Sequence, residues 1–352
     1  SLSLLHQLMG KEFAQAKWQE VFREIRRQTP HHLNEVGIRY MQGAMRTSVD
    51  NQNSDPFVFV RENLQNARDA AFQRREQEPA FQGKLSVSIE KSPEISQTSW
   101  KIIFEDNVGM EPDDVVRYLL VPGMSSKDGD DTSTGKFGQG FFSNLRGADS
   151  VTFKTGKNGQ TTTVVFTPIR GSDGILTDVH VQMEISKGPY QGSRIEVMRN
   201  DAFYQGQESV QNALTKSGEW LDPEVLQVFL EREAVDDEEK SVLINNRTRQ
   251  EEAIRAKVET PLGTLTIYKS DPDNNHIYHR GLPLKPLEEN DHLYVRAKVP
   301  PSIQSALDQA GLVVDLPARM EVVGDRSGIV DPETIYAQLA VPIYSAALMA
   351  VG

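Results

Sequence analysis

The chain has 352 residues, of which 38% are hydrophobic, and this length and apolar content favour two domains over a single core. Its 50 acidic and 38 basic residues give a formal net charge of -12, which argues against bulk nucleic acid as the main partner. The chain contains no cysteine, so disulfides, thiolate metal sites and cysteine nucleophiles are excluded.

Helices are expected at the start of the chain. Apolar residues at near-helical spacing predict helices over 4–28 and 32–45, which would form an N-terminal extension over residues 1–50. Asp55-Pro56 is typical of a helix start, because Asp caps helices and proline is favoured at the first helical position. A third helix is therefore expected from Pro56 to about Arg75.

Strands dominate the next part of the chain. The β-rich runs lie at 84–90, 100–105, 150–155, 161–168, 179–185 and 193–198. Asn158-Gly159 lies between two of these runs and predicts a hairpin, hence antiparallel pairing. This disfavours a doubly wound parallel sheet. We therefore expect an α+β domain over residues 51–205, a two-layer α/β sandwich with a mixed, mainly antiparallel sheet.

The pattern changes after residue 205, where helices alternate with strands. Helices are expected over 201–217, 223–233, 302–310 and 332–349, and strands over 241–244, 263–269, 276–278, 293–299 and 320–323. The alternation predicts a second α/β domain over residues 206–352.

Three polar segments carry the functional signal, and the first lies on the helix from Pro56. Glu62, Asn66 and Asp69 recur at spacings of four and three, opposite an apolar stripe. Most such rows are simply solvated helix faces. A Glu one turn from an Asn also suits water activation beside Mg²⁺, because Glu can accept a proton and an Asn oxygen can bind the ion.

The second and third segments follow the first strands. Glu105 to Met110 leaves a buried strand for a turn, where a carboxylate can accept the exocyclic amine of adenine and Gly109 permits close backbone approach. Gly135 to Phe141 contains three glycines ahead of an apolar helical start, and backbone N–H groups there can bind phosphate. The small and polar stretch 121–131 is typical of a lid.

In order and separation the three segments resemble the GHKL superfamily of ATPases, named for gyrase, Hsp90, histidine kinases and MutL. The resemblance covers about Phe57 to Met198 and implies the Bergerat ATP-binding fold for residues 51–205. The hydrolysing Hsp90- and MutL-like branch fits best, and residues 276–284 resemble the strand-turn-strand of its transducer or middle domain.

The resemblance also implies roles for individual residues. Glu62 would be the general base, Asn66 the Mg²⁺ ligand and Asp106 the adenine reader. Further nucleotide contacts would come from Asp69, Gly109, Met110, Ser126, Lys127, Gly135, Lys136, Phe137, Gly138, Gln139, Gly140, Phe141 and Ser193. A cation from the second domain would reach the terminal phosphate, and the candidates are Lys285, Arg319 and Arg326, of which Arg326 has the most loop-like setting.

One departure from the family pattern leaves the adenine reader open. The segment Asp106 to Met110 is one residue shorter than the family's Asp-x-Gly-x-Gly-Met motif. Asp106 keeps the Asp-Asn and Gly-Met dipeptides in place, whereas an ungapped match would put Glu105 at the Asp position.

The resemblance implies an ATPase cycle in which ATP and Mg²⁺ bind, the lid over 122–135 closes, two protomers associate as a nucleotide-dependent homodimer, and Glu62 activates water. The alternatives are an ATP- or ADP-sensing module without turnover and a DNA-processing GHKL ATPase, which would need a basic groove. A histidine kinase is disfavoured because neither His31 nor His32 has a kinase-like context. With no apolar run of membrane-spanning length, a cytoplasmic location without membrane contact is expected.

Overall fold

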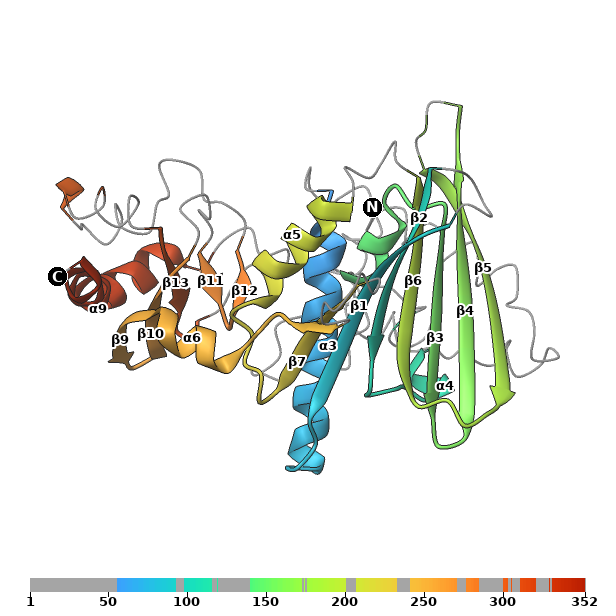
Figure 1. Ribbon diagram of the computed structural model, residues 1–352, viewed down its shortest axis with the longest axis horizontal. Helices are drawn as coiled ribbons and strands as arrows, with labels where there is room; N and C mark the ends of the chain where they lie inside the picture. Colours follow the sequence, from blue (N-terminus) through green and yellow to red (C-terminus); the bar gives the residue numbers. More distant parts are fainter. Residues whose placement is uncertain are drawn as a thin grey trace. The chain divides into compact units, whose positions relative to one another are not determined.

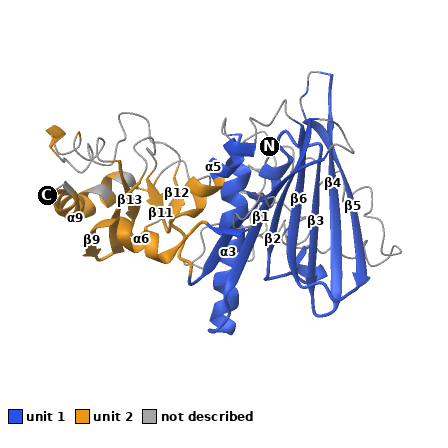
Figure 2. Cartoon of the chain, viewed as in Figure 1, with its two compact units in different colours: residues 1–213, 224–243 blue, residues 214–223, 244–352 orange. Residues whose placement is uncertain are grey.

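The computed structural model describes residues 56–92, 98–115, 119, 140–172, 174, 176–200, 207–232, 241–270, 277–284, 300–302, 305, 311–320, 329 and 331–351. The chain forms two compact units (Figure 2). Unit 1 comprises residues 1–213 and 224–243, and unit 2 comprises residues 214–223 and 244–352. The sequence suggested a single boundary after residue 205, but the chain enters unit 2, returns to unit 1 and enters unit 2 again.

Unit 1 is built on a mixed sheet of eight strands in the order β5-β4-β3-β6-β2-β1-β7-β8 (Figure 1). The strands are β1 (Gly83–Lys91), β2 (Ser99–Asp106), β3 (Ser150–Lys157), β4 (Gln160–Arg170), β5 (Leu176–Lys187), β6 (Gly192–Asn200), β7 (Leu226–Glu231) and β8 (Ser241–Leu243). Neighbouring strands are antiparallel except β1 and β7. The expected mixed, mainly antiparallel sheet is confirmed.

One face of this sheet carries helix α3 (Val58–Gln77) and the short 3₁₀ helix η2 (Gly140–Leu145). The ring of Phe59 on α3 meets Phe104 on β2 edge-on, with ring centroids 6.1 Å apart. The ring of Phe141 on η2 lies 5.3 Å from that of Phe166 on β4 and 5.9 Å from that of Phe153 on β3. Alternate strand residues point to opposite faces, so these contacts define the helix-covered face. We call it the inner face.

The hairpin expected at Asn158-Gly159 is present. Both residues have positive φ, 53° and 75°, and they join β3 to β4, in which Lys157 pairs with Gln160. Two successive positive φ values are those of a type I′ turn, whose twist matches antiparallel strands.

Two expectations for helices are wrong. Within the range 223–233, residues 226–231 form strand β7: Leu226, Val228 and Leu230 are buried at every second position, and β7 pairs in parallel with β1. The helix expected after the glycine-rich loop is only the six-residue η2. A helix this short has little macrodipole, so phosphate binding there would have to rest on individual N–H groups.

Unit 2 contains a five-stranded sheet in the order β12-β11-β13-β10-β9. Its strands are β9 (Ile254–Thr260), β10 (Gly263–Lys269), β11 (Tyr278–His279), β12 (Leu282–Pro283) and β13 (Leu312–Leu316), and the helices described in or beside unit 2 are α5 (Gln207–Gly218), which begins in unit 1, α6 (Arg247–Ala253) and α9 (Pro332–Val351). Strand β10, the turn between β11 and β12 and helix α9 match expectation, whereas β9, β13 and α6 were not anticipated. The strand expected over 293–299 lies outside the described residues, as does most of the helix expected over 302–310.

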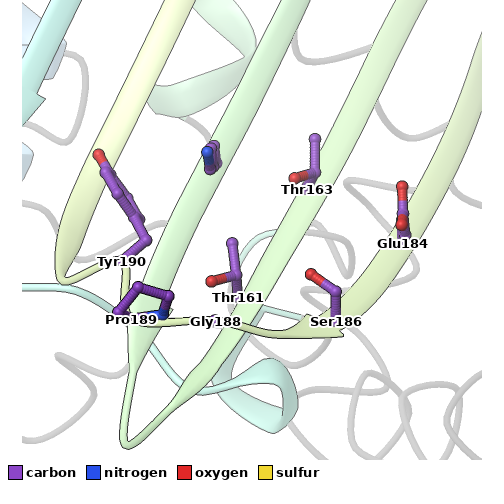
Figure 3. A pocket seen from close by; sticks show the side chains of 8 residues that line it. Thr161, Thr163, Glu184, Ser186, Gly188, Pro189 and Tyr190 are labelled. Atoms are coloured by element: carbon purple, nitrogen blue, oxygen red, sulfur yellow. The ribbon is translucent and has the colours of Figure 1, made fainter.

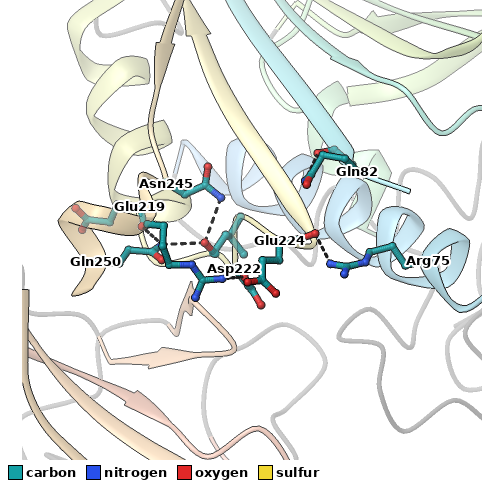
Figure 4. Close-up of polar contacts among 10 residues, drawn as sticks. Arg75, Gln82, Glu219, Asp222, Glu224, Asn245 and Gln250 are labelled. Atoms are coloured by element: carbon teal, nitrogen blue, oxygen red, sulfur yellow. Dashed lines mark hydrogen bonds and ion pairs between the residues drawn. The ribbon is translucent and has the colours of Figure 1, made fainter. Parts of the chain in front are cut away.

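The core of unit 2 lies between α9 and the sheet, where Leu265, Ile267, Val314, Leu339 and Ile343 are buried. Elsewhere in unit 2 the carbonyl oxygen of Leu221 accepts hydrogen bonds from the side chains of Asn245, at 3.1 Å, and Gln250, at 2.9 Å (Figure 4). None of the helices in the described part of the chain combines the length and apolar character needed to cross a membrane.

Phe59 anchors α3 to the inner face, which gives a first prediction. It is fully buried, and the guanidinium of Arg199 lies 4.2 Å from its ring centroid. Phe59→Ala should lower the free energy of unfolding of unit 1 by about 3–5 kcal/mol, through lost contacts and a cavity. Urea denaturation followed by circular dichroism measures this. Ile169→Ala, at a side chain that is 47% exposed, is the control and should cost under about 1 kcal/mol.

Candidate functional site

The polar row of α3 is not a solvated helix face. The side chain of Glu62 is only 13% exposed, and Asn66 is partly buried. The side chain of Asp69 has no exposed surface. Its Oδ1 forms an ion pair with Nη1 of Arg68 at 2.8 Å. A helix that buries polar side chains among its apolar ones commits them to specific contacts, because an unpaired buried polar group is costly. These polar side chains therefore do more than keep the helix surface soluble.

Glu62 brings the first and third sequence segments together. Its Oε1 pairs with Nη2 of the neighbouring Arg61 at 3.2 Å. Its Oε2 lies so close to Gly140 that a Cβ on that residue would overlap the oxygen. A side chain at position 140 would therefore have to displace the carboxylate of Glu62, a residue far away in sequence.

A buried pair of asparagines fixes η2 against α3. The side chain of Asn63 donates to Oδ1 of Asn144 at 2.8 Å, and Asn144 donates back to Oδ1 of Asn63 at 3.2 Å. Asn144 also donates to the carbonyl oxygen of Phe141 at 2.7 Å. Sequence reasoning missed both residues, because only the folded chain places Asn144 opposite α3. The pair determines where Gly140 sits relative to Glu62.

Asp106 lies at the end of β2, within a row of polar residues that crosses the inner face. Successive strands place Asp106 beside Ser193, Ser193 beside Thr155, and Thr155 beside Thr162. Ser193 was expected near Asp106, and the register agrees. Rows further from this end of the sheet are apolar, such as Phe104, Ile195, Phe153 and Val164. The inner face thus ends in a polar strip.

The environment of Asp106 changes its acidity. The pKa of Asp106 is raised to about 6, chiefly by burial and to a small extent by the charge of Glu105, although hydrogen bonds from the backbone N–H groups of Val108, Gly109 and Ser193 oppose the shift. The N–H of Val108 donates to Oδ1 at 2.8 Å. Three N–H groups aimed at one carboxyl favour its ionised form, so Asp106 is still mainly an acceptor at pH 7.

Thr155 joins the turn after Asp106 to the strip, although the sequence did not single it out. Its hydroxyl accepts the N–H of Met110 at 2.8 Å, lies 3.0 Å from the hydroxyl of Ser193, and lies 3.1 Å from the carbonyl oxygen of Gly192. Neighbouring Thr162 is 1% exposed, and its hydroxyl has no hydrogen-bond partner within the part of the chain that is described. The strip therefore retains unused hydrogen-bonding capacity.

Glycines hold the Asp106 turn against the strands. A Cβ on Gly109, which has φ of 75°, would overlap the carbonyl oxygen of Gly156 on β3. A Cβ on Gly192 would overlap the carbonyl oxygen of Asp106. Gly109 was expected to admit a ligand to the backbone, whereas the close approach observed here is to β3. The sharp turn is thus part of the sheet's own packing.

Glu105 lies on the opposite, outer face of the sheet. Its Oε2 pairs with Arg194 at 2.8 Å, and its Oε1 accepts the hydroxyl of Tyr190 at 3.1 Å. Phe104 and Asp106 share the inner face, and Glu105 between them points away from α3. Of the two carboxylates left open by the sequence, only Asp106 belongs to the polar strip.

The outer face beside Tyr190 is hollowed (Figure 3). The hollow has a volume of about 460 Å³, and it is lined by Lys154, Thr161, Thr163, Glu184, Ser186, Gly188, Pro189 and Tyr190. The ammonium of Lys154 lies 4.8 Å from the ring centroid of Tyr190. This polar hollow lies on the face away from Asp106 and α3, so it is separate from the strip.

Helix α3 connects the two ends of the inner-face site. Near its start Glu62 meets Gly140, and near its end Nη1 of Arg74 donates to the carbonyl oxygen of Val108 at 3.2 Å. At a rise of 1.5 Å per residue, the backbone positions of Glu62 and Arg74 are about 18 Å apart along the helix axis. We use the name inner-face site for Glu62, Asn66, Asp106, Thr155 and Ser193 with Gly140.

Several predicted site residues lie outside the described residues, namely Ser126, Lys127, Gly135, Lys136, Phe137, Gly138, Gln139, Lys285 and Arg326. Arg319 is described, and it lies in an exposed turn of unit 2 after β13. Within the described ranges, no three His, Cys, Asp or Glu side chains are grouped to hold a metal. A metal at the inner-face site would depend on Asn66, whose carboxamide makes no hydrogen bond to another described residue.

Neither a scan against protein-family models nor a search of curated proteins finds a match for this chain.

The raised pKa of Asp106 gives a prediction about stability. The folded chain holds this proton more tightly than the unfolded chain, so the contribution is fully present below about pH 4 and is lost as pH rises through about 6. Asp106→Asn should remove this loss. The variant should gain on the order of 1–3 kcal/mol relative to wild type between pH 4.5 and pH 7.5. Urea denaturation at both pH values measures the gap, and an equal gap at both would contradict the assignment.

Proposed function

We propose that this chain binds ATP and hydrolyses it with Mg²⁺ at the inner-face site, as an ATPase of the GHKL type with a Bergerat-like fold. The observation that carries the proposal is the contact between Glu62 and Gly140. It joins a carboxylate suited to water activation to the last glycine of a phosphate-binding sequence. Asp106, at the end of β2, lies on the same face of the sheet, and the turn that follows it accepts a hydrogen bond from Arg74 further along α3.

The polar strip suits the adenine end of the nucleotide. An ionised Asp106 can accept a hydrogen bond from the exocyclic amine, and the hydroxyls of Ser193 and Thr155 can bond ring nitrogens directly or through water. The strip borders apolar rows of the inner face, which suits a flat base that is polar only at its edge. Glu105 is the poorer candidate, because Arg194 and Tyr190 occupy it on the other face.

Glu62 suits the phosphate end. Arg61 holds Oε1, which leaves Oε2 beside Gly140 as the oxygen that can accept a proton from an attacking water. Asn66 lies one turn further along α3, between Glu62 and the Asp106 turn, and can offer one oxygen to Mg²⁺. When bound, Mg²⁺ would offset the negative charge of the phosphates, with water and phosphate oxygens as its other ligands.

Charge stabilisation at the terminal phosphate and the coupling of hydrolysis to movement would involve residues outside the inner-face site. A Lys or Arg at 285 or 326 would stabilise charge on the terminal phosphate. Closure of the segment 122–135 and association of two protomers would couple hydrolysis to movement, as in a clamp. The turn between β11 and β12, where Arg280 and Gly281 have φ of 55° and 72°, supports the transducer-like interpretation of unit 2.

Replacing Glu62 separates binding from hydrolysis. Glu62→Gln should keep ATP affinity within about threefold and lower kcat at least a hundredfold, because the amide cannot accept the proton. Phosphate release and equilibrium binding of ATP measure the two quantities. The control is Glu76→Gln at an exposed position on the same helix. Unchanged turnover in Glu62→Gln would overturn the assigned base, and a wild-type chain that binds ATP without turnover would favour a nucleotide sensor.

Gly140→Ala tests the contact itself. The added methyl group would displace the carboxylate of Glu62 while leaving Asp106 and the strip in place. We expect kcat to fall at least tenfold with little change in the affinity for ADP. Gly188→Ala adds the same methyl group on the outer face and should leave kcat unchanged. Equal loss in both variants would indicate general destabilisation, and the proposed contact would then have no specific role.

A further inference from the structure

The outer edges of the two sheets are unequally protected. Natural proteins keep sheet edges from pairing with other chains by making them short or charged. Strand β8 has three residues and β12 has two, so both are short. Strand β9 carries Arg255, Lys257 and Glu259 at its exposed positions. The remaining edge strand, β5, is the longest of the four, and its formally charged residues are Asp178, Glu184 and Lys187.

Strand β5 ends the eight-stranded sheet and has 12 residues (Figure 1). From Val179 to Ser186 it contains no proline, and Glu184 is its only formally charged side chain apart from the titratable His180. The side chains alternate, with His180, Gln182 and Glu184 exposed and Val179, Val181 and Met183 buried. Within the described ranges only β4 pairs with it, so β5 is the edge of the described sheet. The N–H of Val179 donates to Oδ1 of Asp178 at 2.9 Å.

We propose that β5 pairs antiparallel with β5 of a second copy of this chain, with Gln182 on the two-fold axis. In this register His180 lies opposite Glu184 of the second copy, twice by symmetry. On the inner face Val181 lies opposite Met183, and Val179 opposite Ile185. Directly opposed side chains of opposite charge or of apolar character stabilise antiparallel strands, and each contact here occurs in duplicate.

The alternatives in register are poorer. A shift by one residue would bring exposed side chains to the inner face and buried ones to the outer face. A shift by two residues in one direction would put Asp178 opposite Glu184, which is a pair of like charges. A shift by two in the other direction would put Glu184 opposite Gln182 and leave His180 opposite Ser186. Of these registers, only the one centred on Gln182 pairs Glu184 with an imidazole, which can carry a positive charge, whereas the last gives Glu184 the neutral carboxamide of Gln182.

The pairing also places a second copy beside the hollow of the outer face. Glu184 and Ser186 line that hollow, in which Figure 3 labels both. The imidazole of His180 from the second copy would therefore approach its rim. The proposal does not depend on ATP hydrolysis, since β5 takes no part in the inner-face site.

A single cysteine tests the two-fold axis directly, because the natural chain has none. Directly opposed residues of antiparallel strands have Cα atoms about 4.5–5.5 Å apart, which suits a disulfide. Without nucleotide and under mild oxidation, Gln182→Cys should form a covalent dimer. Thr167→Cys, exposed on the outer face of β4 and paired with His180, is the matched control and should stay monomeric.

Three outcomes would overturn the proposal. Equal cross-linking of both variants would mean random collision. A Gln182→Cys chain that stays monomeric yet reacts freely with maleimide would mean that the edge is open. If it reacts with neither its counterpart nor maleimide, another segment of the same chain covers β5. Since no nucleotide is present, none of these results bears on the proposed ATPase.

A charge exchange tests the register. His180→Glu would place a carboxylate opposite Glu184 at both symmetry-related positions. The repulsion should weaken the dimer roughly tenfold, as measured by sedimentation equilibrium. Adding Glu184→His to the same chain restores both pairs in the opposite sense and should restore the affinity. Circular dichroism checks that each variant is folded. A double variant as weak as His180→Glu would overturn the register.

Discussion

The burial of α3 against the inner face is the interaction on which the rest of unit 1 depends. Phe59 and Leu64 are fully buried in this contact, and the asparagine pair formed by Asn63 and Asn144 adds η2 to it. Apolar burial supplies the stability, and the paired amides set the position, because a buried hydrogen-bonding group without its partner is costly. Glu62 and Asn66 are held at the site by the same helix turns that form the core.

The inner face also explains how an apolar core and a polar site coexist. On β2, β3 and β6 the inward residues next to α3 and η2 are mostly apolar, with Arg199 as an exception, and the row at one end contains Asp106, Ser193 and Thr155. Most of the hydrogen bonds of this strip are internal, yet the pKa of Asp106 is raised by its burial. Stability would be greater with a neutral side chain at this position. A destabilising ionisable group that is well positioned is typical of binding sites.

Much of the framework could be predicted from local patterns. The β-rich runs between turn residues predicted the first six strands, and Asn158-Gly159 predicted the hairpin, because its backbone preference is local. The composition of residues 223–233 is compatible with a helix or a strand, and a helix was predicted. Strand β7 forms within this range because it can pair with β1, which local sequence does not reveal. Glu62, Asn66 and Asp106 were identified from sequence, but Thr155 and Asn144 were not, since neither stands out without knowledge of the strand register and the position of η2.

The sequence by itself determined helix α3 and the first six strands in their order, the three polar segments and the face of α3 that packs. These properties depend on residues within a few positions of one another. Only the tertiary structure decided that Gly140 meets Glu62, that Asp106 faces α3 while Glu105 faces Arg194, and that β5 is left at an edge. Those outcomes depend on strand order and register, which join residues far apart in the chain. A one-residue shift in the register of a strand would move its side chains to the opposite face.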